Sequence, residues 1–206
     1  KTVLGQERAA ENRVYCFDGK NTTKWLCYGE IKSIPDNKCI SPKHFEVLIA
    51  SKNNGFGFGI FVNIPRIKNP IELIALFRAL GINNDKEICK YIVYDVNSVQ
   101  YAEILKFLQA SIIDANKYPT QEDALRHIVA SVMYTPLNMD KETGAQKKNE
   151  FALDVLENDI FPHCKTKTQK LYFLGYMTSQ VIQTALGWRS KDDRDSYVNK
   201  RIELTG

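Results

Sequence analysis

The first third of the chain alternates apolar and polar residues with the two-residue period of β-strands. Turn-forming residues such as Asp18-Gly19 separate these runs, and the alternating glycines from Gly55 to Gly59 predict the tip of a hairpin. No lysine and no helix follow these glycines in the way a phosphate-binding loop requires. The runs rich in β-branched and aromatic residues, which we predict to be strands, are 13–17, 24–34, 45–50 and 59–63.

From residue 69 onward, apolar residues recur with the period of amphipathic helices. Asn69-Pro70 predicts a helix start and Gly81 its end, because asparagine caps helices, proline suits the first helical position and glycine follows helix ends. Further helices are predicted from Asn84 onward and over 99–113, 120–133, 148–158 and 169–186, with a loop at 135–145. The last helix is the most apolar, and its Gly175 and Ser179 should let a neighbour pack closely. Antiparallel strands followed by helices predict the α+β fold class.

Length and composition are those of one large domain with short arms. The 206 residues are 44% hydrophobic and 25% charged, so the chain can bury a core without metal or disulfide support. No run of apolar residues is long enough for a membrane span. The five cysteines are scattered without a CxxC pair, which favours free thiols over a zinc site. The chain begins without methionine, and we expect it to be a piece of a longer polypeptide.

No converging set of catalytic residues or metal ligands is evident. The GxSxG, HExxH, Walker A and GxGxxG motifs are all absent from the sequence. Asp192, Asp193 and Asp195 come closest to a metal cluster, but the intervening Arg194 favours ion pairing instead. We therefore expect no catalytic residue, no tightly bound metal and no cofactor in this segment. The net charge of +4 is only mildly basic for a nucleic-acid-binding domain.

The most informative segment lies at the C-terminal end. Residues 192–206, DDRDSYVNKRIELTG, resemble the DDRDxxxNKRxxLxG signature of the second-largest subunit of multi-subunit DNA-directed RNA polymerases. Other words of that family occur in the same order, namely QER at 6–8, FRALG at 77–81, EDAL at 122–125, FPH at 161–163 and FLGYM at 173–177. By this resemblance the chain is the lobe domain of that subunit. It would consist of a hinge arm from the protrusion domain (1–14), the lobe itself (15–187) and a returning hinge segment that carries the signature (188–206).

The resemblance implies a non-catalytic part of a nucleotidyltransferase that joins ribonucleotides on a DNA template. The lobe would form one wall of the downstream DNA cleft, and the Mg²⁺ of the assembled polymerase would be bound by another subunit. Carried over residue by residue, Asp195 and Lys200 are predicted to contact DNA, with Arg201 adjacent. Where the family has His and Gly, this chain has Ser196 and Val198, and valine does not readily adopt the positive φ that glycine permits.

The implied partners are the other polymerase subunits, especially the largest, and downstream DNA, with no membrane. One alternative is a protein-docking platform, because cellular relatives receive an initiation factor on the outer face of the lobe. Four acidic residues could serve that face or could simply form a solvated helix face: Glu150, Asp154, Glu157 and Asp159. A small-molecule enzyme unrelated to polymerases is the remaining alternative.

The composition also bears on the source of the chain. Lys, Asn and Ile are abundant, which suggests an AT-rich genome. Together with the departures at Ser196 and Val198, this favours a divergent polymerase of a large DNA virus. The expected location is intracellular: a viral factory in the host cytoplasm or the virion for a viral polymerase, and the nucleus for a cellular one.

Overall fold

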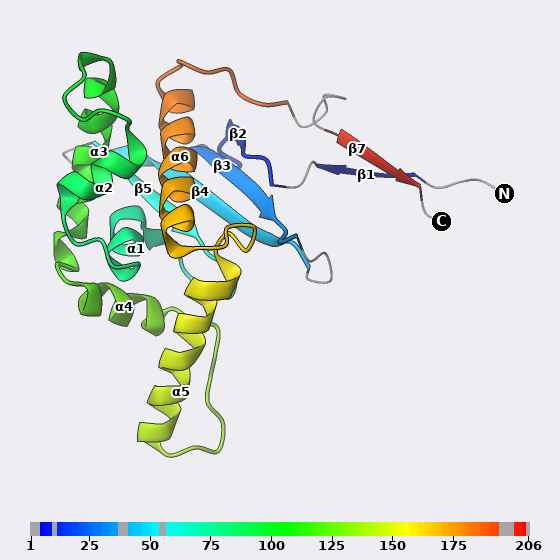
Figure 1. Ribbon diagram of the computed structural model, residues 1–206, viewed down its shortest axis with the longest axis vertical. Coiled ribbons are helices and arrows are strands. Elements are labelled where there is room, and N and C mark those ends of the chain that lie inside the picture. The colour runs from blue at the N-terminus through cyan, green and yellow to red at the C-terminus, as the bar shows by residue number, and fades with distance from the viewer. Residues whose placement is uncertain (1–4, 10–11, 37–40, 54–56, 194–199, 205–206) are drawn as a thin grey trace.

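The computed structural model describes residues 5–9, 12–36, 41–53, 57–193 and 200–204. An antiparallel sheet packs against helices, and a separate two-stranded ribbon is formed by the two ends of the chain (Figure 1). The predicted α+β class is confirmed. None of the helices in the described ranges is long and apolar enough to cross a membrane.

The main sheet has five strands in consecutive antiparallel order. The predicted strands correspond to the first four, and the predicted hairpin joins the third to the fourth, with its tip at 54–56 outside the described residues. The strands are β2 (Tyr15–Asp18), β3 (Trp25–Ser33), β4 (Lys43–Asn53), β5 (Phe58–Asn63) and β6 (Ile71–Glu72).

The two faces of this sheet differ because successive side chains of a strand point to opposite sides. On one face, fully buried residues such as Ile31 and Val47 join the main core, which also contains helix α6 (Lys167–Ala185). At Gly29 a Cβ atom would lie 2.4 Å from Val181, so glycine permits the close approach of α6. The opposite face carries a smaller cluster of Tyr15, Phe17, Tyr28 and Leu48.

The helices follow the sheet in the sequence, and α6 packs across its apolar face. Within the described ranges they are α1 (Leu73–Ala79), α2 (Asp85–Ile92), α3 (Ala102–Asp114), α4 (Gln121–Ala130), α5 (Lys141–Asp154), a π-helical turn (Val155–Asp159) and α6, with short 3₁₀ turns at Val99–Tyr101 and Ala115–Lys117. The Asn84 and Thr120 side chains cap α2 and α4 by accepting backbone N–H bonds, as the sequence predicts. The close packing predicted at Gly175 is also confirmed, because a Cβ there would lie 1.9 Å from the Tyr91 carbonyl oxygen.

Three predicted boundaries are wrong. Asn69 does not begin a helix, because Ile71 and Glu72 pair with β5 and α1 starts only at Leu73. The helix predicted over 120–133 ends at Ala130, where α4 stops. The loop predicted over 135–145 ends early, since the Asp140 side chain accepts the backbone N–H of Thr143 and caps α5.

The two ends of the chain form a ribbon that the sequence analysis did not predict. Strand β1 (Gly5–Ala9) pairs antiparallel with β7 (Lys200–Leu204). The ribbon lies beyond edge strand β2, on the side of the molecule away from α3 and α4 (Figure 1). The segments that precede β2 and follow α6 are therefore joined by backbone pairing.

Candidate nucleic-acid interface

The β1–β7 ribbon brings together two sequence words from opposite ends of the chain. Its register pairs Arg8 with Arg201 and Ala9 with Lys200. The QER motif at 6–8 lies on β1 and is thus paired with β7, whose first two residues are the Lys200 and Arg201 of the NKR motif. No spacing in the sequence could have predicted this pairing.

The predicted DNA-contacting residues lie in and just before β7. Asp195, together with Ser196 and Val198, falls outside the described residues. The backbone of Lys200 and Arg201 is placed by the ladder with β1. The DNA contacts of these three residues, Asp195 included, remain predictions.

The first residue of the signature anchors the returning segment to the main sheet. The backbone N–H of Asp192 donates to the Cys16 carbonyl at 2.8 Å, and the Cys16 N–H donates to Asp192 Oδ2 at 2.9 Å. Arg13 Nη2 lies 3.6 Å from Asp192 Oδ1. Because Cys16 belongs to edge strand β2, this exchange satisfies backbone groups that the sheet leaves open. The interpretation of these carboxylates as ion-paired therefore holds for Asp192.

The same anchor perturbs the buried thiol beneath it. Burial raises the pKa of Cys16, and the negative charge of Asp192 raises it further. Burial also raises the pKa of Cys27, to about 12. The four cysteines within the described ranges are free, as predicted, and a raised pKa keeps such thiols protonated and unreactive.

Two arginines that the sequence analysis did not single out lie beside Asp192. Arg13 and Arg189 line a hollow of about 230 Å³ together with Asp192 and Tyr176. The Arg13 guanidinium also lies over the Tyr15 ring, 4.8 Å from its centroid. Arg189 belongs to the basic C-terminal segment, whereas Arg13 is distant in the sequence and only the β2 edge brings it here.

The acidic residues proposed for protein docking are partly engaged within the fold. Asp159 has a side chain only 3% exposed and forms ion pairs with Arg66 and Lys43. Asp154 lies 2.8 Å from the Arg66 guanidinium, whose hydrogen bond lowers the pKa of that carboxyl. Of the four, Glu150, Asp154 and Glu157 are exposed, and only Asp159 is buried. The prediction of a solvated helix face is therefore wrong for Asp159, because this carboxylate connects the loop after β5 to the π-helical turn that follows α5.

Comparison with known proteins agrees with the sequence words. The sequence model of the family described as RNA polymerase Rpb2, domain 2, matches residues 10–203. The DNA-directed RNA polymerase II subunit RPB2 of Encephalitozoon cuniculi is 32% identical over 210 residues, and subunit 2 of the Arabidopsis thaliana enzyme is 32% identical over 216 residues. The DNA-directed RNA polymerase subunit 2 of Acanthamoeba polyphaga mimivirus is 27% identical over 225 residues, so a viral relative exists but the two eukaryotic ones are more similar.

Each of these matches covers the chain completely but only part of the relative. The chain spans 17% of the Encephalitozoon and Arabidopsis subunits and 18% of the mimivirus subunit. The family match, in contrast, extends over nearly all of this chain. The resemblance drawn from the sequence is therefore confirmed, and the chain belongs to the RNA polymerase Rpb2 domain 2 family, the lobe of the second-largest polymerase subunit.

Proposed function

We propose that this domain forms part of the wall of the downstream DNA cleft in a DNA-directed RNA polymerase. The printed names of its relatives identify them as subunits of that nucleotidyltransferase. The domain would position DNA without supplying a catalytic residue, and Mg²⁺ would be held by another subunit. Its partners would be the other polymerase subunits, the largest above all, with 1–14 and 188–206 as the arms that connect the lobe to its neighbour.

The register of the ribbon is the observation that supports DNA binding. Arg8 and Arg201 occupy directly opposed positions, and Lys200 precedes Arg201 on the same strand. Strand β7 thus carries two consecutive basic residues on a paired backbone, and the phosphate backbone of DNA supplies a regular array of anions that such residues can bind. Asp195 cannot bond phosphate, and we assign it to a base amino group or to orienting Lys200.

A salt series on the assembled polymerase tests this function. The double substitution Lys200→Ala/Arg201→Ala removes two phosphate contacts. The slope of log affinity against log salt should therefore shrink by roughly 1.8 for duplex DNA or roughly 1.4 for a single strand. The loss should not depend on DNA sequence, because phosphate contacts position the duplex without specifying it. Asp195→Ala should alter sequence preference and leave the slope unchanged.

A matched control removes the same charge from another part of the surface. Lys147 and Lys148 lie on α5, which extends away from the ribbon (Figure 1). Lys147→Ala/Lys148→Ala should leave the slope unchanged. The DNA-contact role is wrong if the Lys200/Arg201 variant keeps the wild-type slope, or if both double variants change it equally.

One observation favours the alternative of a docking platform on α5. Apolar side chains are exposed on or just before this helix: Leu137, Met139 and Leu153. Exposed Glu150 lies one turn before Leu153, so the surface combines apolar and acidic character. Leu153→Asp in the assembled polymerase should then weaken retention of an initiation factor without altering the salt slope. Unchanged retention would remove α5 as the docking site.

A further inference from the structure

Two glutamates face each other across the middle of the sheet, on the side away from α6. The β3–β4 register pairs Glu30 directly with Glu46, and both side chains are only 12% exposed. Carboxylates at opposed positions repel one another, and this repulsion is stronger when the groups are shielded from water. This pair therefore attracts positive charge, and the charge of Lys20 already acts on Glu46.

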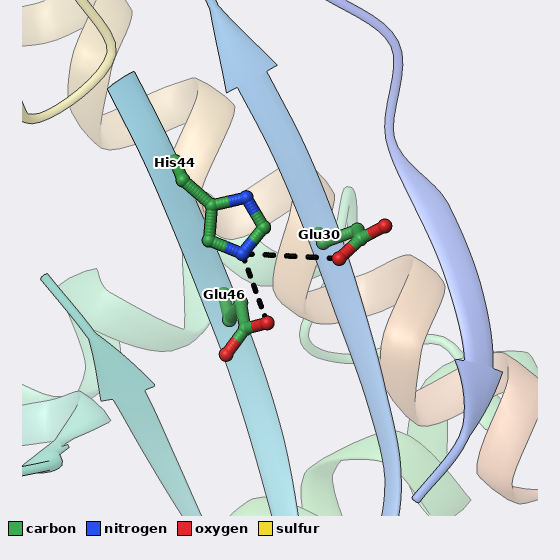
Figure 2. Close-up of side chains that lie close together, drawn as sticks. All are labelled: Glu30, His44 and Glu46. Carbon is green, nitrogen blue, oxygen red and sulfur yellow. Dashed lines mark hydrogen bonds and ion pairs between the residues drawn. The ribbon is translucent and has the colours of Figure 1, made fainter. Parts of the chain in front are cut away.

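A histidine completes the group on the same face. His44 lies two residues before Glu46 on β4, so the two side chains project from the same side of the sheet. His44 Nε2 is 2.9 Å from Glu46 Oε1 and 3.8 Å from Glu30 Oε2 (Figure 2). The three potential ligand atoms all lie within 4.8 Å of one another.

We propose that Glu30, His44 and Glu46 bind a divalent transition-metal ion of the zinc type on the outer face of the sheet. Zinc binds His nitrogen and Glu oxygen at about 2.0–2.2 Å, which places tetrahedral ligands about 3.3 Å apart. The two distances from His44 Nε2 lie on either side of this value. One imidazole with two carboxylates suits zinc better than Mg²⁺ or Ca²⁺, which take oxygen ligands.

The surroundings support three protein ligands and one from solvent. Asn63 Nδ2 donates to Glu46 Oε2 at 2.9 Å, which leaves Oε1 of that carboxylate directed at His44. The His44 side chain is 45% exposed, so water can reach a fourth position. The site thus differs from the sequence-based expectation of no resident metal. The register of β3 and β4 brings the three ligands together, and their spacing in the sequence matches no known metal-binding motif.

Titration calorimetry of the metal-stripped 206-residue chain with Zn²⁺ tests the proposal. We expect one ion per chain, a loss of affinity of more than about tenfold in His44→Gln, and a similar loss in Glu30→Gln and Glu46→Gln. His127→Gln is the matched control. His127 Nε2 pairs with Glu72 Oε2 at 2.8 Å. Among the described residues, these two do not belong to any group of three potential metal ligands. This variant should bind Zn²⁺ like the wild type.

Two further measurements guard against misfolding and thiol binding. Circular dichroism should show His44→Gln to be folded, and Zn²⁺ should raise the melting temperature of the wild type but not of this variant. The absorption spectrum of the Co²⁺ form should lack the intense near-ultraviolet band of thiolate ligation. The proposal is overturned by no stoichiometric binding to the wild type, by equal binding to folded His44→Gln, or by a thiolate band.

Discussion

Replacing Asp192 with alanine tests whether the first signature residue anchors the returning segment to the sheet. The substitution removes the acceptor at Oδ2, to which the buried residue Cys16 donates its backbone N–H at 2.9 Å. It also removes the ion pair with Arg13, whose side chain is 44% exposed. The backbone bond from the Asp192 N–H to the Cys16 carbonyl can survive, because it does not involve the side chain.

The expected loss follows from these two contacts. A hydrogen bond to a charged acceptor contributes about 1.5–3 kcal/mol, and its loss leaves a sheltered N–H without a partner. A half-exposed ion pair adds less than about 1 kcal/mol. We therefore expect the free energy of unfolding to fall by roughly 2–3 kcal/mol, which corresponds to a decrease of about 5–10 °C in melting temperature for a domain of this size. Asp192→Asn retains an acceptor oxygen and should lose less than about 1 kcal/mol.

Urea unfolding and thermal melts of the wild type, Asp192→Ala and Asp192→Asn measure this loss of stability directly. The control is Asp36→Ala, since Asp36 forms an ion pair with Lys165 in which the side chains are 93% and 79% exposed. Such a surface pair should change stability by less than about 0.5 kcal/mol. Two results would refute the reasoning: Asp192→Ala no less stable than Asp36→Ala, or Asp192→Asn as unstable as Asp192→Ala.

Two further predictions concern the core. Burial and the charge of Lys170 hold the pKa of His163 below its ordinary value of 6.5, so the unfolded chain takes up a proton before the folded one does. The free energy of unfolding should therefore fall as the pH drops below 6.5. In His163→Gln, the urea concentration at the unfolding midpoint should depend less on pH between about pH 7 and pH 5 than in the wild type. An equally steep decline in the variant would contradict this. Gly175→Ala should destabilise the chain by about 2 kcal/mol or more, because its Cβ would lie 1.9 Å from the Tyr91 carbonyl oxygen on α2. A melting temperature within error of the wild type would show that α2 and α6 can move apart without cost.

Local chemistry explains why most elements could be predicted from the sequence. The caps of α2 and α4 use the side chains of Asn84 and Thr120, and each cap involves only neighbouring residues. The strands β2 to β5 follow local runs of β-branched and aromatic residues, which form the main core on one face of the sheet and a smaller cluster on the other. A pattern carried by adjacent residues can be recognised without knowing what the element packs against.

The errors arise where distant segments determine the structure. Ile71 has a convincing helix start before it, but pairing with Val62 of β5 makes it a strand residue. The ribbon joins the first and last described residues, so no local window contains both strands. Asp159, the last residue of the π-helical turn at Val155–Asp159, likewise forms an ion pair with Arg66, far away in the sequence.

The candidate sites divide in the same way. The DDRDSYVNKR words were recognisable because they are contiguous. The position of Arg13 beside Asp192 and the meeting of Glu30 with His44 depend on strand edges and register. Neither of these two contacts can be predicted from the spacing of residues in the sequence. Both depend on the register of the strands, and a shift of one residue would move each side chain of a strand to the other face of the sheet.

Site-specific crosslinking tests the DNA-cleft role most directly. A photoreactive amino acid replaces Lys200 in the assembled polymerase engaged on a DNA template, and a second preparation carries it at Lys148 on α5. The account predicts a crosslink from position 200 to downstream DNA and none from position 148. A polymerase that transcribes normally but crosslinks from position 200 only to protein would contradict it.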